Sequence, residues 1–231
     1  MCGIIALFGE EVEGGHHLLH HRGPDDYSTR TLGKCRMDFY RLSINDLTPA
    51  GMQPFKDESS MLVCNGEIYN HTLFRTGQEK STSDCEILMP LIKYVGVEKT
   101  IDMINGDFAF VYTDGKHVVA ARDPVGVRPL FYTRYGPESI AFASEVKALL
   151  FLNSEIHIFP PGHIYDSYID DFICYHNGYW PIHKHVNDCS LVKLRDTLEQ
   201  AVHERIATTY RESGFLLSCG LDCSLIFSIV A

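Results

Sequence analysis

Short apolar runs separated by turn residues dominate most of the chain. Runs of this kind predict strands at residues 1–8, 61–64, 107–113, 118–122, 130–133, 140–144 and 164–168. Because these runs follow one another closely, they favour antiparallel sheets over units with a crossover helix. A short helix is expected over 13–21, and a second one over 83–95. The second would begin with a capping box at Ser83 and be kinked by Pro90.

The pattern changes near residue 190. Residues 175–188 are polar and irregular, and the next segment, 190–207, carries apolar residues at helical spacing. A short buried strand is then expected at 215–217, a loop at 218–224 and the start of a helix at 225–231. This order is typical of the opening of an α/β domain. We therefore expect one domain over 2–175, a linker over 176–189 and a truncated second domain over 190–231.

Composition and charge exclude several classes of protein. The chain has 231 residues, 45% of them hydrophobic, and a formal net charge of −10, which argues against binding to nucleic acid. No apolar run approaches the ~20 residues of a membrane span, so no membrane contact is expected. The N-terminus lacks a secretory signal, and the eight cysteines are scattered without a C-x-x-C pair. We therefore expect free thiols in a cytoplasmic protein.

The chain begins Met-Cys-Gly, which makes Cys2 a candidate nucleophile. Initiator methionine is trimmed when the next residue is small, and Cys2 would then become the N-terminal residue. A free α-amine has a pKa near 8 and lies within reach of the Cys2 thiol, so one residue would supply both nucleophile and base. The same three residues would also fit an ordinary N-terminus. Their meaning therefore depends on the rest of the sequence.

Several further motifs follow Met-Cys-Gly in a fixed order. They are His21-Arg22-Gly23-Pro24-Asp25, Arg41-Leu42-Ser43-Ile44, Asn65-Gly66-Glu67-Ile68-Tyr69-Asn70, Ser83-Asp84-Cys85-Glu86, Arg122-Asp123 with Pro129-Leu130-Phe131-Tyr132, and Ala143-Ser144-Glu145-Val146-Lys147-Ala148-Leu149. Together with Cys2 they resemble the class II glutamine amidotransferases of the asparagine synthetase type, a branch of the N-terminal-nucleophile hydrolases. The resemblance implies an α+β fold, a four-layer α/β/β/α sandwich with two antiparallel sheets face to face.

The resemblance also implies an activity and the residues that perform it. Cys2 would attack the side-chain amide of L-glutamine and form a thioester, releasing ammonia. The Asn65 side chain and the Gly66 N–H would stabilise the oxyanion. Neither a metal nor an organic cofactor is implied for this step. From the residues alone, Asn65-Gly66 would equally suit a hairpin turn.

The same comparison implies a substrate pocket. Arg41 would bind the glutamine α-carboxylate through its planar fork, and Asp84 would pair with the ammonium group. A capping role for Asp84 at the helix start is a compatible alternative. The pocket would be completed by Leu42, Ser43, Ile44, Asn45, Asn65, Gly66 and Glu67. The loop 22–25 is expected to cover the pocket without taking part in the chemistry.

Residues 218–224 resemble the loop that binds ATP pyrophosphate in the synthetase domain. The expected nucleotide positions are Leu217, Ser218, Gly220 and Asp222. Cys219 and Cys223 replace the glycine and serine of that loop, which crowds the phosphates and weakens a donor. One strand cannot form a parallel sheet, so ATP and Mg are expected only if a complete synthetase domain is supplied. Such a domain, or a second copy of the chain, is the partner that these residues suggest.

Three other interpretations remain open from the sequence. The chain is alternatively a non-catalytic remnant that senses glutamine or binds a partner, or a fragment of a complete asparagine synthetase. The third is a metal-binding protein, because four histidines form two pairs at i,i+4 spacing: His16, His17, His20 and His21. No glutamate of the H-E-x-x-H type accompanies them, so no metal site is expected.

Overall fold

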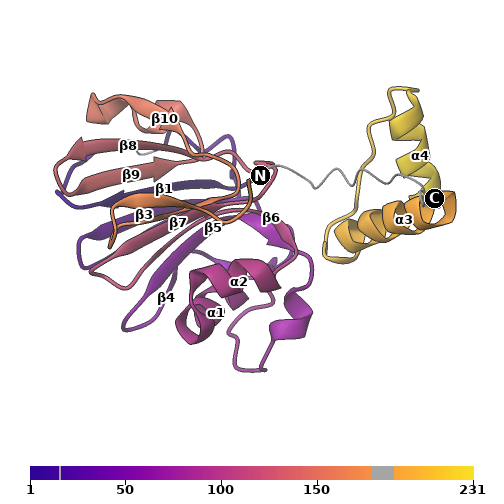
Figure 1. The fold of residues 1–231 in the computed structure, drawn as a ribbon, viewed down its shortest axis with the longest axis horizontal. Coiled ribbons are helices and arrows are strands. Elements are labelled where there is room, and N and C mark those ends of the chain that lie inside the picture. The colour runs from indigo at the N-terminus through magenta and orange to yellow at the C-terminus, as the bar shows by residue number, and fades with distance from the viewer. Residues whose placement is uncertain (16, 178–189) are drawn as a thin grey trace. The chain divides into compact units, whose positions relative to one another are not determined.

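The computed structural model describes residues 1–15, 17–177 and 190–231 and divides the chain into two units, Met1–Gly178 and Tyr179–Ala231. The first unit contains two antiparallel sheets that lie face to face (Figure 1). The first sheet has the order β10-β8-β9-β1-β3-β2. Its strands are β1 (Gly3–Phe8), β2 (Asp26–Leu32), β3 (Cys35–Arg41), β8 (Phe131–Gly136), β9 (Ser139–Ala143) and β10 (Ile156–Ile158).

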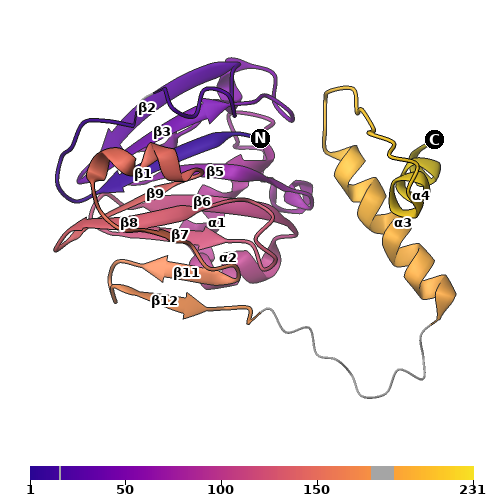
Figure 2. The ribbon, with the colours of Figure 1, turned by 90° about the horizontal axis from the view of Figure 1, so that it is seen from above.

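The second sheet has the order β12-β11-β7-β6-β5-β4. Its strands are β4 (Phe55–Lys56), β5 (Met61–Ile68), β6 (Gly106–Thr113), β7 (Val118–Arg122), β11 (His163–Asp166) and β12 (Asp171–Cys174). Figure 2 shows the stack from above, with β11 and β12 at one edge. The predicted antiparallel arrangement of closely spaced strands is confirmed. Strands β2 and β3, which the sequence analysis did not predict, pair over their whole length as a hairpin.

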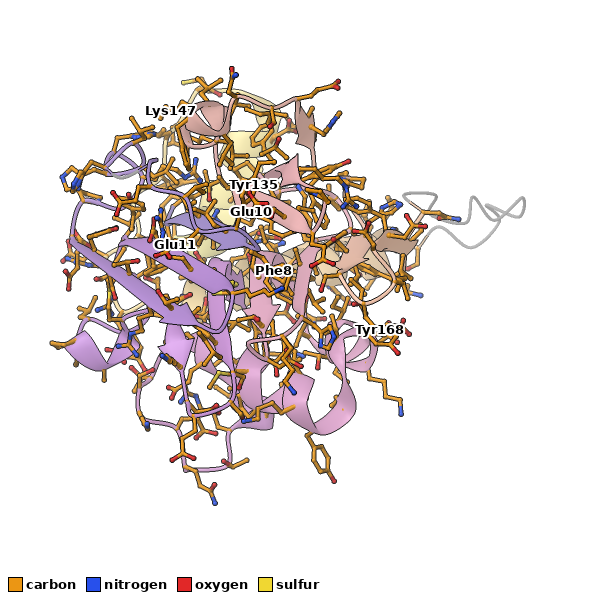
Figure 3. The ribbon with its side chains drawn as sticks, turned by 90° about the vertical axis from the view of Figure 1, so that its left-hand side faces the viewer. Phe8, Glu10, Glu11, Tyr135, Lys147 and Tyr168 are labelled. Carbon is orange, nitrogen blue, oxygen red and sulfur yellow. The ribbon has the colours of Figure 1, made fainter. Side chains whose placement is uncertain are left out.

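β1 explains why the chain starts with an uninterrupted apolar run. Successive side chains of a strand point to opposite faces. Ile4 and Ala6 therefore pack between the sheets, while Ile5 and Leu7 pack on the outer face of the first sheet. Both faces are covered, so every residue of β1 is buried. Figure 3 shows the end of the sandwich where β1 finishes, and there the Tyr135 hydroxyl donates to the carbonyl oxygen of Phe8 at 3.1 Å.

The outer layers differ on the two sides of the sandwich. Helices α1 (Leu88–Val95) and α2 (Val97–Met103) cover the second sheet together with the 3₁₀ helix η3 (Asp84–Ile87). On the first sheet, the covering apolar residues come from the turn at 17–22 and from the 3₁₀ helices η4 (Val146–Ala148) and η5 (Leu150–Leu152). The four-layer α/β/β/α sandwich is therefore present, with one outer layer made of short 3₁₀ helices and turns. Two further 3₁₀ helices are η1 (Pro49–Gly51) and η2 (His71–Phe74).

The helix predicted at 13–21 is wrong. The described part of this segment contains a turn over 17–22 and no helix. Gly14, Gly15 and His17 have φ values of 146°, 73° and 67°, which are incompatible with a right-handed helix. The chain turns sharply here so that Leu19 can reach the outer face of β1.

The predicted start of the second helix is also wrong in detail. Ser83 makes no capping hydrogen bond with its side chain, and the carboxylate of Glu86 accepts from the backbone N–H groups of Lys80 and Ser81 instead of that of Ser83. A 3₁₀ turn precedes α1, so Pro90 falls in the first turn of α1. Its missing N–H is harmless there, and the expected kink has no cause.

The second unit contains two helices, α3 (Leu191–Ala207) and α4 (Leu221–Val230), in its described residues. α3 agrees with the predicted helix, whereas α4 begins four residues earlier than predicted. The strand expected at 215–217 is wrong: this segment has no regular structure, and Leu216 is 95% exposed. None of the described residues in this unit forms a strand, so it has no sheet to join. The expected linker at 176–189 lies outside the described residues from 178 onward.

Candidate active site

The thiol of Cys2 lies where β1 begins and β3 ends. The two strands are antiparallel and pair Gly3 with Tyr40, which brings Cys2 beside the residues that follow β3. Cys2 Sγ lies 3.5 Å from the carbonyl oxygen of Leu42, to which it donates, and 3.4 Å from the Leu42 amide nitrogen. The backbone of Leu42 therefore fixes the position of the sulfur.

A pocket opens at this end of the sandwich and contains every amidotransferase site residue predicted from the sequence. It encloses about 50 Å³ and is lined by Met1, Cys2, Phe39, Arg41, Leu42, Ser43, Ile44, Asn45, Asp46, Gly51, Gln53, Cys64, Asn65, Gly66, Glu67, Ser83, Asp84, Cys85 and Arg128. Residues from both sheets, from η3 and from two loops thus share one cavity.

Asn65 and Gly66 lie within β5, and the alternative hairpin turn at this position is wrong. They pair with Ala109 and Phe108 of β6 in the regular ladder. Asn65 is 1% exposed, and its Nδ2 atom has no hydrogen-bond partner. A buried donor without a partner is costly, at about 1–3 kcal/mol. Its presence in the pocket of Cys2 therefore indicates a place for an acceptor that is not part of the chain.

Gln53 was missed in the sequence analysis, although it holds β5 in place next to Asn65. Its Oε1 accepts from the Cys64 N–H at 2.6 Å, and its Nε2 donates to the Cys64 carbonyl at 3.1 Å. The Gln53 side-chain amide thus makes the two backbone hydrogen bonds to Cys64 that a residue of a neighbouring strand would otherwise make. Only the three-dimensional fold reveals this pairing, since the two residues belong to different elements.

Arg41 ends β3 and turns its guanidinium into the loop that follows. One nitrogen donates to the Thr48 carbonyl at 2.7 Å and another donates to the Asp46 carbonyl. Asp46 is itself held by the N–H groups of Thr48 and Thr82. A guanidinium has five N–H donors, and the two backbone contacts of Arg41 use only some of them. The others can bind a ligand in the pocket. The guanidinium is thereby fixed in direction, as binding of a planar carboxylate requires.

Two carboxylates line the same pocket. Asp84 is buried at the start of η3, and its Oδ2 accepts from the Ile68 N–H at 2.7 Å. Glu67 Oε1 lies 3.6 Å from Nη2 of Arg128. Burial raises the pKa of Glu67, and the nearby Arg128 opposes this shift. Asn45 also lines the pocket, and its buried Oδ1 has no hydrogen-bond partner.

The loop 22–25 does not line the pocket, which corrects the expectation that it covers it. Instead, Arg22 contacts the backbone of Cys2 outside the pocket lining: its Nε donates to the Cys2 carbonyl at 3.0 Å and its Nη1 to Glu145 Oε1 at 3.0 Å. Although burial works in the opposite direction, contacts with Arg22, His21 and Lys147 lower the pKa of Glu145 to about 2. Both residues belong to motifs singled out in the sequence, but spacing alone did not connect them.

The electrostatic environment affects the thiol and the terminal amine in different ways. Burial raises the pKa of the Cys2 thiol, while the Leu42 backbone, the N-terminus and Arg128 lower it. Burial lowers the pKa of the terminal amine, which belongs to Met1 in this chain, and the Arg22 and Arg128 cations lower it further. Both effects favour a protonated thiol beside a neutral amine.

Two other predicted features lie elsewhere. His21 contacts Glu145 at 2.8 Å, and the described residues contain no group of three potential metal ligands; His16 is outside them. In the second unit, Leu217, Ser218, Gly220 and Asp222 are exposed and border the start of α4. Cys219 has a φ of 60°, the left-handed conformation that glycine adopts without strain.

Comparisons with known proteins show the family of this chain. The sequence model of a family described as a glutamine amidotransferase domain matches residues 1–176. The chain is 37% identical to asparagine synthetase [glutamine-hydrolyzing] 2 of Arabidopsis thaliana over 99% of its own length and 42% of that protein. It is also 36% identical to a probable asparagine synthetase of Schizosaccharomyces pombe over 100% of its own length and 45% of that protein. The chain thus spans less than half the length of these relatives.

The fold has known counterparts as well. The glutamine phosphoribosylpyrophosphate amidotransferase of B. subtilis superposes with a TM-score of 0.64 at 17% identity, over 98% of this chain and 63% of that one. A structure described as the allosteric regulatory enzyme of purine biosynthesis gives a TM-score of 0.63 at 18% identity, again over 98% and 63%. At such identities the likeness concerns the fold alone.

Among the described residues, none of the helices is long and apolar enough to cross a membrane. On the evidence of its sequence family and its sandwich fold, the chain belongs to the glutamine amidotransferases of class II, with asparagine synthetases among its relatives.

Proposed function

We propose that this chain hydrolyses L-glutamine to L-glutamate and ammonia through a thioester on Cys2, after Met1 has been removed. The buried, unpartnered Nδ2 of Asn65, in the pocket that holds Cys2, is the observation that carries this proposal. An oxyanion beside the sulfur would give this donor its missing acceptor. Its stabilisation would lower the barrier to attack.

The proposed hydrolysis has two stages, formation of the thioester on Cys2 and its cleavage by water. Cys2 Sγ forms a bond to the amide carbon of glutamine while its proton passes to the α-amine. The amine then gives this proton to the leaving nitrogen, the C–N bond breaks and ammonia departs. Water attacks the thioester, the S–C bond breaks, and glutamate and the thiol are released. Removing Met1 would place the amine on Cys2 and would enlarge the cavity for the substrate.

The remaining pocket residues support recognition of an amino acid. Arg41 would bind the α-carboxylate, and the carboxylates of Glu67 and Asp84 would bind the ammonium group. Asn45 Oδ1 would add an acceptor, and Leu42, Ser43 and Ile44 would form the wall beside the sulfur. All the polar groups for this chemistry come from the chain itself, so the proposal needs no cofactor.

We further propose that the ammonia serves the synthesis of asparagine from aspartate and ATP on a synthetase domain, as the names of the relatives suggest. The described residues 190–231 do not fit ATP and Mg, because they contain no strand and because Cys219 occupies a glycine conformation. The acceptor domain would then come from a further segment or from a partner. The cysteines of the described residues are all free, which supports a reducing, cytoplasmic setting.

An ammonia assay on C-terminally tagged protein tests the proposal. Wild type should release ammonia and glutamate from glutamine in equal amounts, and intact mass should show the loss of Met1. Cys2→Ala should abolish release, whereas Cys174→Ala, which removes an exposed thiol outside the pocket, should preserve it. Glutamine binding without release by wild type would favour the alternative of a glutamine-sensing module.

A further inference from the structure

Arg128 is a charged residue of the pocket with no role assigned so far. It is 9% exposed, and its Nε is buried without a hydrogen-bond partner. Its Nη2 lies 3.6 Å from Glu67 Oε1, and the residue lines the cavity together with Cys2 and Asn65. A buried guanidinium that is only partly paired keeps a strong electrostatic influence on its neighbours.

The loop that carries Arg128 is fixed by hydrogen bonds. The carboxylate of Asp123 accepts from the backbone N–H groups of Val125, Val127 and Arg128, at 3.2, 2.9 and 3.0 Å. The side chain of Arg122 donates to the Arg128 carbonyl at 2.7 Å. Both backbone polar groups of Arg128 are thus held by Arg122, the last residue of β7, and Asp123, which follows it. The family motif at 122–123 therefore serves to present one cation to the pocket.

The cation acts on three titratable groups. Together with burial, Arg128 lowers the pKa of the Met1 amine, which lies one residue ahead of the Cys2 nitrogen; against burial, it lowers that of the Cys2 thiol and that of Glu67. The charged or titratable groups around the amine and the thiol are Arg22 from the turn after β1, Cys64 and Glu67 from β5, Cys85 from η3, and Arg128. The rest of the pocket adds Arg41, Asp46 and Asp84. Arg22 is already paired with Glu145 at 3.0 Å, whereas the ion pair of Arg128 among the described residues is the longer one with Glu67, at 3.6 Å.

We propose that Arg128 is a positioning residue that orients Glu67 and keeps the N-terminal amine of the nucleophile neutral and ready to accept a proton. This inference rests on the proposed function. A cation beside the amine disfavours its ammonium form. The amine is therefore free to take the thiol proton, and once protonated it readily passes the proton to the departing ammonia.

The pH dependence of kcat/KM for glutamine tests this role. The activity depends on a neutral amine, so its acidic limb follows the pKa of that amine. Arg128→Gln removes the cation, raises that pKa and should move the limb to higher pH by about one unit. Arg128→Lys keeps the charge and should leave the limb near its wild-type position. Arg134→Gln removes a cation from β8, where it pairs with Asp170 outside the pocket, and should shift nothing.

Alkylation by iodoacetamide gives a second readout that needs no turnover. The rate at the N-terminal peptide, followed by mass spectrometry against pH, reports the thiol of Cys2. Its midpoint should rise in Arg128→Gln and remain close to wild type in Arg128→Lys. Thermal unfolding of each variant identifies any that has lost its fold.

The possible outcomes separate the two proposals. A wild-type protein that releases no ammonia refutes the proposed function. An active Arg128→Gln variant with unshifted limb and unshifted alkylation midpoint overturns the role of Arg128 alone. A uniform loss of rate at every pH, with both midpoints unchanged, has the same meaning, since a purely structural residue would behave in that way.

Discussion

Unpartnered polar atoms are concentrated at one place in this molecule. Among the described residues, five buried side-chain atoms lack a hydrogen bond, and three of them belong to pocket residues: Asn45 Oδ1, Asn65 Nδ2 and Arg128 Nε. Buried polar groups are paired in nearly all native structures. Donors and acceptors left open around one sulfur atom are therefore consistent with a site that is completed by its substrate.

Asn65→Ala tests the oxyanion donor at the scale of one residue. We expect kcat for ammonia release to fall about 10²–10³-fold with a small change in KM, because the lost contact forms in the transition state. Asn70→Ala is the matched control in the same motif. The Asn70 side chain contacts the backbone of Met103 and Asn105 and lies outside the pocket, so its loss should affect stability and not kcat. Equal kcat values for both variants would contradict the assignment.

The sequence predicted those pocket residues that belong to contiguous motifs. Met-Cys-Gly contains Cys2, while Arg41 to Asn45 and Asn65 to Glu67 each place several site residues together, and the pocket contains Cys2 and all of these. Gln53, Arg22 and Arg128 were missed for one physical reason. Each acts through a partner that is distant in the sequence, and such pairs form only when the two sheets and their loops assemble.

β5 is the element on which the site depends most. It carries Asn65 and Gly66 in a regular ladder with β6, and the side chain of Gln53 holds its other edge. A Cβ atom at Gly66 would lie 2.5 Å from the Asp107 carbonyl oxygen, closer than real contacts allow. The glycine is therefore required by the close approach of two strands.

Gly66→Ala should separate β5 from β6 and displace Asn65. We expect the free energy of unfolding in urea to fall by about 1–3 kcal/mol, with loss of most glutaminase activity. Gly214→Ala is the control, because a Cβ there meets no atom within 4 Å. An alanine at residue 66 that preserves both stability and activity would show that the strands can adjust.

At the level of elements, the sequence predicted the strands that have long apolar runs, and it predicted α3. Strands β1, β6, β7 and β9 were predicted from their apolar runs. Most residues of these four strands are buried, because both faces of the strands are covered. The predicted capping box at Ser83 is not formed, and the Glu86 carboxylate accepts from the backbone N–H groups of Lys80 and Ser81. The strand at 215–217 failed because a strand needs a neighbour, and the described residues of that unit provide none.

At the scale of the whole molecule, the pocket belongs entirely to the first unit. Its lining residues run from Met1 to Arg128, and the core between the sheets extends only to Tyr165 and Phe172. The second unit exposes large apolar side chains, among them Leu191, Leu216 and Leu221. Exposed apolar surface of this kind is typical of an incomplete or unpartnered domain.

A protein of residues 1–177 should therefore hydrolyse glutamine with a kcat within about twofold of the full chain, since each unit has its own contacts. The full chain should associate more strongly in analytical ultracentrifugation, because it retains the exposed apolar residues of α3 and α4. A large loss of kcat on truncation would show that the second unit supports the site.

The position of Met1 has a practical consequence for handling this protein. Met1 lines the cavity together with Cys2, and β1 begins at the next residue, Gly3, in the middle of a sheet. Any affinity tag fused ahead of Cys2 would start from the position that Met1 holds in the lining of the cavity and would convert the proposed catalytic amine into an ordinary amide. A preparation purified on such a tag would look well folded and yet remain inert, and cleavage by a protease that leaves cysteine first should restore it.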